Sequence, residues 1–491
     1  MLPGNPRYQP KQLRPIFGYD KLFQGVAEVE VAVMQTLGEI GTIPAEVMAD
    51  LSPNVINRLL AIRTTLVDEV ERTGGTYGKA TGHDVRAWVR IAQDIVGPRL
   101  APWVHVPLTS YDPLDTGRML HYRSAYRDVL RPSLQDLVGN FADLVDQFAD
   151  QLQIGRTHGQ HALPITVGFW LASILNRICV NWKRMDETAT GLVGKISGAV
   201  GAYNAQVGLG FYGSHMEQPA EVKISHTFEA MVLRKLGLEP AAISTQVLPP
   251  ENLSSFLFAC IQMSAAIAQL GRDCRHLMRS EIGEVAEEFA DGQVGSSTMA
   301  HKRNPITFEN MEGMWLKSKA EFWKVMEIMV TDHQRDLVAS CIMRDFPVIL
   351  VNLQQQLNSL LRRKTEEGRP FIRRITVDPS ACQRNFDLSS RYILAEPIYI
   401  ALQMAGYEGD AHHFVSHELM PIAMREKMPL AAVLTAKAEE DTDLLRVLGA
   451  IPAEVLDFLH QPELYTGAAR DKAQQIAASA RKTASELTAL S

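Results

Sequence analysis

Residues 137–148 read Leu-Val-Gly-Asn-Phe-Ala-Asp-Leu-Val-Asp-Gln-Phe, and large apolar side chains recur in this stretch every three or four residues. Leu137, Phe141, Leu144 and Phe148 step by four, three and four, which is the spacing of a helix with one face buried in a bundle. The same spacing predicts two further core-facing helices. Their apolar positions are Val26, Val29, Val33 and Leu37, and Leu353, Leu357, Leu360 and Leu361.

The distribution of prolines favours very long helices. No proline lies between Pro164 and Pro219, between Pro250 and Pro305, or between Pro305 and Pro347. Because a proline inside a helix costs about 3 kcal/mol, these gaps leave room for long uninterrupted helices. Alternation typical of strands is scarce. The sequence therefore predicts an all-α fold built around a bundle of long helices.

The chain is long enough for several domains. Its 491 residues exceed the roughly 250–300 residues at which single hydrophobic cores stop growing. Turn residues cluster near Asp112-Pro113, and the stretch Lys-Thr-Glu-Glu-Gly-Arg-Pro at 364–370 is typical of a loop that leaves a bundle. We expect three helical domains. They are an N-terminal domain over about 1–116, a central long-helix bundle over 117–367 and a C-terminal domain over 368–491.

Composition argues against several classes of protein. Apolar residues make up 46% and charged residues 21% of the chain, as in ordinary globular proteins. A net charge of −7 without a basic block argues against nucleic acid as a partner but is compatible with an anionic small substrate. The sequence has no apolar run near about 18 residues and no signal peptide pattern, so we expect a cytoplasmic protein that spans no membrane. The five cysteines are odd in number and lack a Cys-x-x-Cys pair, which indicates reduced thiols.

The segment most informative about chemistry is Gly-Ser-Ser-Thr-Met-Ala-His-Lys-Arg-Asn-Pro at 295–305. Its glycines and small hydroxyl residues are poorly suited to a helix and favour a loop. Ser296 could remove a proton from a carbon beside a carboxylate, while Lys302 and Asn304 hold that carboxylate as negative charge develops on it. A Ser-Ser pair in a glycine-rich loop is also typical of an ordinary solvated turn.

Other segments combine polar residues that a packed core does not require. They are 155–164 with His158, 81–85 with His83 and Asp84, 105–116 with Thr109 and Ser110, 334–344 with Arg335 and Arg344, and the Arg7-Tyr8 pair. Each also has a simpler interpretation. A histidine next to glycine is commonly a turn residue, two arginines commonly pair with surface carboxylates, and Thr109-Ser110 can cap a helix. The sequence contains no glycine-rich phosphate loop of the Walker or Rossmann type.

A histidine cluster raises the alternative of a metal site. His413 and His417 lie four residues apart, with His412 and Glu418 beside them. A pair at this spacing can bind zinc from one helix face. The order His-Glu-x-x-His is absent, however, and no distant carboxylate stands out as a third ligand, so we expect no metal site.

Three of these segments resemble the conserved regions of the fumarase/aspartase superfamily of lyases. Residues 295–305 resemble its signature Gly-Ser-Ser-x-Met-Pro-x-Lys-x-Asn-Pro, and 108–116 and 157–164 resemble its first and second conserved regions. Further matches are more particular to the adenylosuccinate lyases of that superfamily. They are Arg7-Tyr8, His83-Asp84-Val85, 194–204, Thr245-Gln246-Val247 and 334–344. The resemblance extends as far as residue 397 and so covers most of the chain.

The resemblance implies a homotetramer with a shared helical bundle and active sites built from three subunits. It implies β-elimination of fumarate from adenylosuccinate, which leaves AMP, and from succinyl-aminoimidazole carboxamide ribotide in purine biosynthesis. It implies no metal and no organic cofactor. A second hypothesis is another lyase or a carboxymuconate-type cycloisomerase of the superfamily, and a third is a non-catalytic relative. The joint presence of Ser296, His158, Lys302 and Asn304 argues against the third.

The resemblance also implies a role for individual residues. Ser296 is the base, His158 is the general acid that protonates the departing nitrogen, and His83 contacts the substrate and assists. The groups implied for the succinyl carboxylates are Lys302 and Asn304, with Ser297 and Asn310 nearby, and Arg303 is implied as a further substrate-binding residue. Those implied for the nucleotide are Arg7, Tyr8, Arg335, Ser340 and Arg344, with Gly82, Asp84, Thr109, Ser110 and Gln246 lining the remainder.

Three positions depart from the pattern of the family. Ala300 replaces the proline that usually follows the methionine of the signature, which predicts a less rigid loop. Gly82 stands where some relatives carry Arg or Asn, and Pro250 falls where an Arg or His often follows proline. None of the three removes a catalytic group, but together they leave the choice of substrate open.

Overall fold

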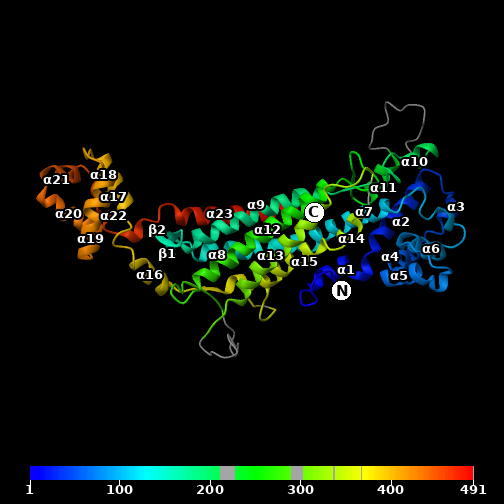
Figure 1. Cartoon of the computed structure of the whole chain (residues 1–491), viewed down its shortest axis with the longest axis horizontal. Coiled ribbons are helices and arrows are strands. Elements are labelled where there is room, and N and C mark those ends of the chain that lie inside the picture. The colour runs from blue at the N-terminus through cyan, green and yellow to red at the C-terminus, as the bar shows by residue number, and fades with distance from the viewer. Residues whose placement is uncertain (211–226, 289–301, 335–337, 367, 490–491) are drawn as a thin grey trace. The chain divides into compact units, whose positions relative to one another are not determined.

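The computed structural model describes residues 1–210, 227–288, 302–334, 338–366 and 368–489 (Figure 1). The chain forms two compact units, each made of three segments. The first contains Met1–Leu134, Val180–Ala265 and Gly313–Asn358, and the second contains Gln135–Cys179, Ala266–Glu312 and Ser359–Ser491. Helices dominate both units, which confirms the predicted all-α fold class. The domain boundaries expected near residues 116 and 367 stay predictions.

The first unit begins with a long helix and several short ones. These are α1 (Arg14–Phe17), α2 (Gln24–Glu39), α3 (Ala45–Met48), α4 (Pro53–Leu60), α5 (Thr64–Thr73) and α6 (Asp84–Val96). Val29 and Val33 on the predicted apolar face of α2 are fully buried. Helix α2 approaches α7 (Tyr111–Ala125) at two glycines, where a Cβ on Gly25 would lie 2.7 Å from the carbonyl oxygen of Gly117. Larger residues at either position would force the helices apart.

Prolines mark where the long helices begin. α12 (Pro250–Leu277) and α15 (Pro347–Leu361) each start at a proline, and α13 (Ile306–Glu327) starts directly after Pro305. A proline fits the first turn because its missing N–H would have no partner within the helix there. The other helices of this region are α8 (Arg131–Gln147), α9 (Val167–Thr190), α10 (Asn204–Gly208), α11 (Phe228–Lys235) and α14 (Val338–Ile342).

The predicted bundle seams are core faces. Leu137, Phe141 and Leu144 of α8 have no exposed surface, and neither do Leu353 and Leu357 of α15. Side chains three and four residues apart share one face of a helix, so the spacing in the sequence identified these positions correctly. Two predicted positions differ: Phe148 lies one residue beyond the end of α8, and Phe148 and Leu361 are only half-buried.

Short strands occur where the sequence suggested only turns. β1 (Leu152–Thr157) and β2 (Gln160–Thr166) form an antiparallel hairpin, joined by His158 and Gly159 with φ of 55° and 77°. Positive φ at both central residues is the type I′ turn that suits the twist of a hairpin. Two shorter pairs complete the strands. β3 (Val193–Gly194) runs parallel to β4 (Glu239–Pro240), and β5 (Val285–Glu287) runs antiparallel to β6 (Ile375–Val377).

The C-terminal helices of the second unit enclose a hydrophobic core of their own. The helices that supply its buried residues are α17 (Ala395–Met404), α18 (Ala411–His413), α19 (Met420–Glu426), α20 (Leu430–Glu440), α21 (Thr442–Gly449) and α22 (Ala453–Leu459). In the chain, α16 (Pro379–Asp387) precedes this group and α23 (Ala469–Ala489) follows it. Ile398, Leu402, Leu419 and Leu434 are at most 2% exposed in this core. Its buried members all lie within 394–459, so local packing suffices to form it.

Helix α12 is long and apolar enough to cross a membrane by length and composition alone. Its most apolar window is nevertheless 72% buried within the structure. Core helices of soluble proteins meet the same criteria, because they also bury apolar side chains on most of their surface. We therefore assign α12 to the protein core.

Candidate active site

His83 caps the N-terminus of helix α6. Its Nδ1 accepts a hydrogen bond from the backbone N–H of Arg86 at 3.4 Å. The capping acceptor is normally a side-chain oxygen, and an imidazole nitrogen takes that place here. Asp84 is the first residue of the helix, and its carboxylate lies 3.3 Å from the same nitrogen. The cap fixes the ring and leaves Nε2 for other partners.

Two further segments of the first unit converge on this helix end. The Oγ of Ser110 lies 3.5 Å from Nε2 of His83, and the guanidinium of Arg344 lies 3.5 Å from the carboxylate of Asp84. Next to Ser110, the hydroxyl of Tyr111 donates to the Oγ of Ser340 at 3.1 Å. The structure thus brings together five predicted site residues. We call them the His83 cluster: His83, Asp84, Ser110, Ser340 and Arg344.

A fully buried ion pair holds the turn that carries Thr109. The carboxylate of Asp112 contacts the ammonium of Lys195, and neither side chain is exposed. The same carboxylate accepts backbone N–H groups from Thr109 at 2.8 Å, Ser197 at 3.1 Å and Gly198 at 3.2 Å. Four donors therefore satisfy one buried charge, which offsets the cost of its desolvation. The pair joins the turn before α7 to the segment after β3.

A second buried carboxylate fixes the segment after β3. Glu229 accepts hydrogen bonds from the backbone N–H of Ile196 and from the hydroxyl of Tyr203, both at 2.7 Å. Burial raises the pKa of Glu229, and these hydrogen bonds only partly oppose the rise. Residues 194–204 are expected near the site only because they resemble the adenylosuccinate lyases. The structure shows what the segment does locally, which is to bring Lys195 to Asp112.

His105, four residues before Thr109, was not selected from the sequence. Its backbone N–H donates to Glu30 at 3.0 Å, and its Nδ1 lies 2.6 Å from the other oxygen of that carboxylate. Burial lowers the pKa of His105, but the hydrogen bond and charge of Glu30 outweigh burial, so the pKa is raised. The available signal was Glu30 itself, since a carboxylate on the apolar face of a helix needs a partner.

Replacing Glu30 with Gln is expected to remove a pH-dependent part of the stability. Because the folded-state pKa of His105 is raised, the interaction stabilises the fold fully below the unfolded pKa of about 6.5 and is lost as pH rises through the folded pKa. In urea denaturation, the free energy of unfolding of the wild type should exceed that of Glu30→Gln by more at about pH 6 than at about pH 9. A difference that stays constant with pH would contradict this assignment.

In the second unit, His158 lies at the tip of the β1–β2 hairpin with its side chain exposed. His161 is only three residues away but is used differently. Its Nδ1 lies 2.9 Å from the Oγ of Ser389, and burial together with nearby Arg156 lowers its pKa. Of the two histidines in this motif, His158 is therefore the one accessible to a ligand.

Lys302, Arg303 and Asn304 directly precede Pro305 and helix α13 in the second unit. Lys302 and Arg303 are exposed, and Asn304 and Asn310 are half-buried. Buried Glu287 accepts backbone N–H groups from the first turn of α13 at 2.7 and 3.0 Å. A carboxylate at a helix N-terminus is favourable because unpaired N–H groups and the helix dipole both point at it. Glu287 thus fixes the place where the signature segment ends.

The other predicted site residues are placed as follows. Ser296, Ser297 and Arg335 lie outside the described residues, as does Ala300. Arg7 is exposed, and the Lys317 ammonium lies 4.7 Å from the centre of the Tyr8 ring. Gly82 adopts a φ of 59°, a conformation that an Arg or Asn at this position would adopt less readily. Gln246 lies between Thr245 and Val247, which both line the cavity described next.

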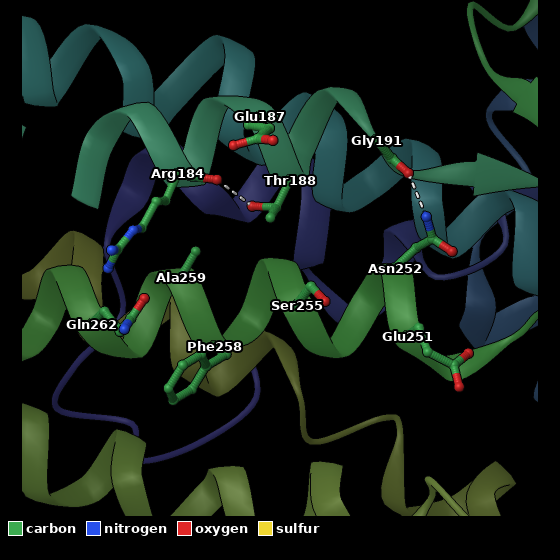
Figure 2. Close-up of a pocket in the computed structure, with 10 residues that line it drawn as sticks. All are labelled: Arg184, Glu187, Thr188, Gly191, Glu251, Asn252, Ser255, Phe258, Ala259 and Gln262. Atoms are coloured by element: carbon green, nitrogen blue, oxygen red, sulfur yellow. Dashed lines mark hydrogen bonds between the residues drawn. The ribbon is translucent and has the colours of Figure 1, made fainter. Parts of the chain in front are cut away.

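Two of the cavities lined by described residues lie in the first unit. One, of about 410 Å³, is lined by Tyr111 of α7 and by residues near α12 and α14. The other, of about 530 Å³, lies between α9 and α12 (Figure 2). The side-chain amide of Asn252 donates to the carbonyl of Gly191 at 2.8 Å. Figure 2 shows this hydrogen bond at one end of the cavity and the ring of Phe258 in the lower part of the view. No predicted site residue lines this second cavity.

The described residues contain no group of three His, Cys, Asp or Glu side chains placed to hold a metal ion. The rings of His413 and His417 stack 4.4 Å apart with 11° between their planes. Two nearly parallel rings at this separation pack face to face as a stacked pair. Nothing in this arrangement favours the metal alternative.

The first comparison is with sequences of known proteins. A family model described as lyase matches residues 18–317 of the chain. The chain is 29% identical to an adenylosuccinate lyase of Pyrococcus horikoshii over 475 residues, which cover 96% of each protein. It is 31% identical to an adenylosuccinate lyase of Bacillus subtilis, over 88% of this chain and 91% of that protein.

The second comparison is with solved structures. A 3-carboxy-cis,cis-muconate lactonizing enzyme from Pseudomonas putida matches with a TM-score of 0.74 and 24% identity, over 98% of each chain. A fumarate lyase from a Mesorhizobium species matches with a TM-score of 0.75 and 20% identity, over 97% of this chain and 100% of that one. At this level of identity the matches establish a shared fold.

Proposed function

Because the chain belongs to the lyase family, we propose that it cleaves adenylosuccinate to AMP and fumarate. Succinyl-aminoimidazole carboxamide ribotide is the second substrate, since it carries the same succinyl group on nitrogen. The observation that carries the proposal is the His83 cluster at the end of α6. It combines an imidazole, two hydroxyls and a guanidinium, which suit an anionic substrate and proton transfer.

The proposed reaction is a β-elimination. A base removes a proton from the carbon beside one carboxylate, the neighbouring carbon–nitrogen bond breaks, and an acid protonates the departing nitrogen. We assign Ser296 as the base and Lys302 as the charge that stabilises its alkoxide, because a neutral serine is a weak base. We assign His158 as the acid, since an imidazole can hold a proton near neutral pH and release it. His83 contacts the substrate and assists.

The remaining groups are assigned to the two anionic ends of the substrate. Ser297, Lys302, Arg303, Asn304 and Asn310 bind the succinyl carboxylates, and Arg7, Tyr8, Arg335, Ser340 and Arg344 bind phosphate and ribose. The contact of Arg344 supports this assignment. Its guanidinium is half-exposed and lies 3.5 Å from Asp84, which is a weak surface pair. Such a guanidinium can turn toward a phosphate and bind it through two parallel hydrogen bonds.

An absorbance assay tests the proposal. Purified protein is incubated with adenylosuccinate, the loss of succinyl-purine absorbance is followed, and fumarate is detected separately. Turnover with fumarate release is expected. If adenylosuccinate is not cleaved, the proposed substrate is wrong, and a carboxymuconate or another succinyl compound as substrate would establish the alternative within the superfamily. A Ser296→Ala variant that keeps full activity on any of these substrates would refute the base assignment.

We also propose that the protein is a cytoplasmic homotetramer. The parts of α12 and α13 that belong to the first unit expose large apolar side chains: Phe258 is 47% exposed, Trp323 70% and Met326 52%. Monomeric proteins rarely leave such side chains clustered in water. The cavity of Figure 2 lies beside Phe258, where a helix of a second copy can fill it. Light scattering should give about four times the chain mass of 54.6 kDa; a monomer would contradict the proposal.

A further inference from the structure

The cavity of about 410 Å³ in the first unit adjoins the His83 cluster along the chain. Tyr111 follows Ser110, Ala339 precedes Ser340, and Met343 precedes Arg344. Three residues of the cavity wall are therefore direct neighbours of three residues of the cluster. The hydrogen bond from Tyr111 to Ser340, at 3.1 Å, makes a wall residue and a cluster residue neighbours in space as well. A ligand held by the cluster can extend into this space.

The walls of the cavity are mostly apolar. They include Met119 of α7, Leu253 of α12, and Ile328, Met329 and Met343. Methionine side chains adapt to flat rings and make favourable contacts with them through sulfur. The size lies in the range of roughly 300–1,000 Å³ that is common for small-molecule sites. The space therefore suits an uncharged ring better than a carboxylate or a phosphate.

Two of the polar side chains on the walls are already held by partners within the protein. Asp115 is paired with Arg118 at 2.9 Å and accepts the backbone N–H of Leu248 at 3.0 Å. Ser244 is hydrogen-bonded to Ser197 at 2.6 Å. The amide oxygen of Gln334, in contrast, is buried and has no hydrogen-bond partner among the described residues. A buried acceptor left without a donor costs about 1–3 kcal/mol, so a ligand that supplies an N–H is favoured here.

We propose that this cavity is a specificity pocket for the ring of the leaving amine, and that the Oε1 of Gln334 accepts an N–H from that ring system. The inference rests on the proposed function, because it takes the substrate to be a succinyl group on an aromatic amine. Pro249 and Pro250 form part of the wall, and the described residues that line the cavity include no lysine or arginine. This wall consequently favours an uncharged ring and offers no positive charge to an anion.

Filling the cavity tests the proposal. Ala339→Trp places a large side chain in the wall, and Val338→Trp on the same helix is the matched control, since Val338 is 63% exposed and does not line the cavity. Binding of adenosine and of aniline is measured by calorimetry, and folding is checked by circular dichroism. Ala339→Trp should weaken binding of both by more than about tenfold, while Val338→Trp keeps wild-type affinity. Unchanged affinity in Ala339→Trp would overturn the inference.

Gln334→Met tests the hydrogen bond and serves if Ala339→Trp does not fold. Wild-type protein should bind adenosine about tenfold more tightly than purine riboside, which lacks the amino group, and Gln334→Met should remove this difference. If Gln334→Met prefers adenosine over purine riboside as strongly as the wild type does, Gln334 does not accept this hydrogen bond.

Turnover separates this inference from the proposed function. If the wild type cleaves adenylosuccinate and Ala339→Trp leaves KM unchanged, the pocket is wrong and the function stands. If the wild type binds aniline but does not cleave adenylosuccinate, and Ala339→Trp no longer binds aniline, the function is wrong and the pocket stands.

Discussion

Replacing His158 with asparagine is expected to lower kcat by about 10²–10⁴-fold while leaving the fold intact. Asparagine has no group that can donate a proton to a departing nitrogen near neutral pH. It is also the residue most compatible with the backbone here, because His158 and Gly159 occupy the two central positions of a type I′ turn with positive φ. Asn-Gly is the preferred pair for that turn, so the melting temperature should stay the same or rise.

The matched control is His161→Asn, in the same motif. His161 contacts Ser389 within the second unit and has a lowered pKa, so it serves the structure of β2. Its replacement should lower the melting temperature and change kcat far less than His158→Asn does. The two variants are compared by single-turnover kinetics and thermal unfolding. If His158→Asn retains kcat, or if both variants lose it equally, His158 is not the general acid.

Periodic features of the sequence predicted the helices well. The core faces of α8 and α15 follow directly from the spacing of leucine and phenylalanine, and the prolines at 250, 305 and 347 stand where three long helices begin. Both rules depend on local geometry, since side chains three or four residues apart share a face and proline fits only the first turn. The β1–β2 hairpin was expected only as a turn around His158. Its strands are short and their alternation is broken by glycine and proline, so no period of two was visible.

The site residues that belong to a sequence motif could be predicted. The pairs that form between distant segments only in the folded protein could not. The residues of the His83 cluster come from motif segments far apart in the chain, and the structure brings them together. Asp112 and Lys195 were missed as a pair, although both lie in segments chosen by resemblance. They lie 83 residues apart in the sequence. No local pattern predicts which buried carboxylate a given lysine pairs with. The signature residues Ser296 and Ser297 lie outside the described residues, so their roles stay predictions.

Replacing Lys195 with methionine is expected to lower the free energy of unfolding by about 3–5 kcal/mol. Methionine keeps most of the length and apolar contact of lysine but removes its charge. The carboxylate of Asp112 would then remain fully buried with three backbone N–H donors and no counter-charge. The matched control is Lys235→Met. Lys235 pairs with Glu39 at the surface, where both side chains are partly exposed, so its loss should cost less than about 1 kcal/mol.

A double variant distinguishes two causes of lost stability. One is the loss of the attraction between Lys195 and Asp112, and the other is the cost of a buried Asp112 carboxylate without a counter-charge. In Asp112→Asn/Lys195→Met both charges are gone, and the amide oxygen can still accept the backbone N–H groups of Ser197 and Gly198, so the double variant should be more stable than Lys195→Met alone. Its KM for adenylosuccinate should nevertheless rise, because the amide has no second oxygen to hold the backbone N–H of Thr109 beside Ser110. Urea denaturation and steady-state kinetics measure the two effects. If Lys195→Met is no less stable than Lys235→Met, the buried pair does not stabilise the fold. If the double variant regains stability and keeps a wild-type KM, the pair does not position the Thr109 turn.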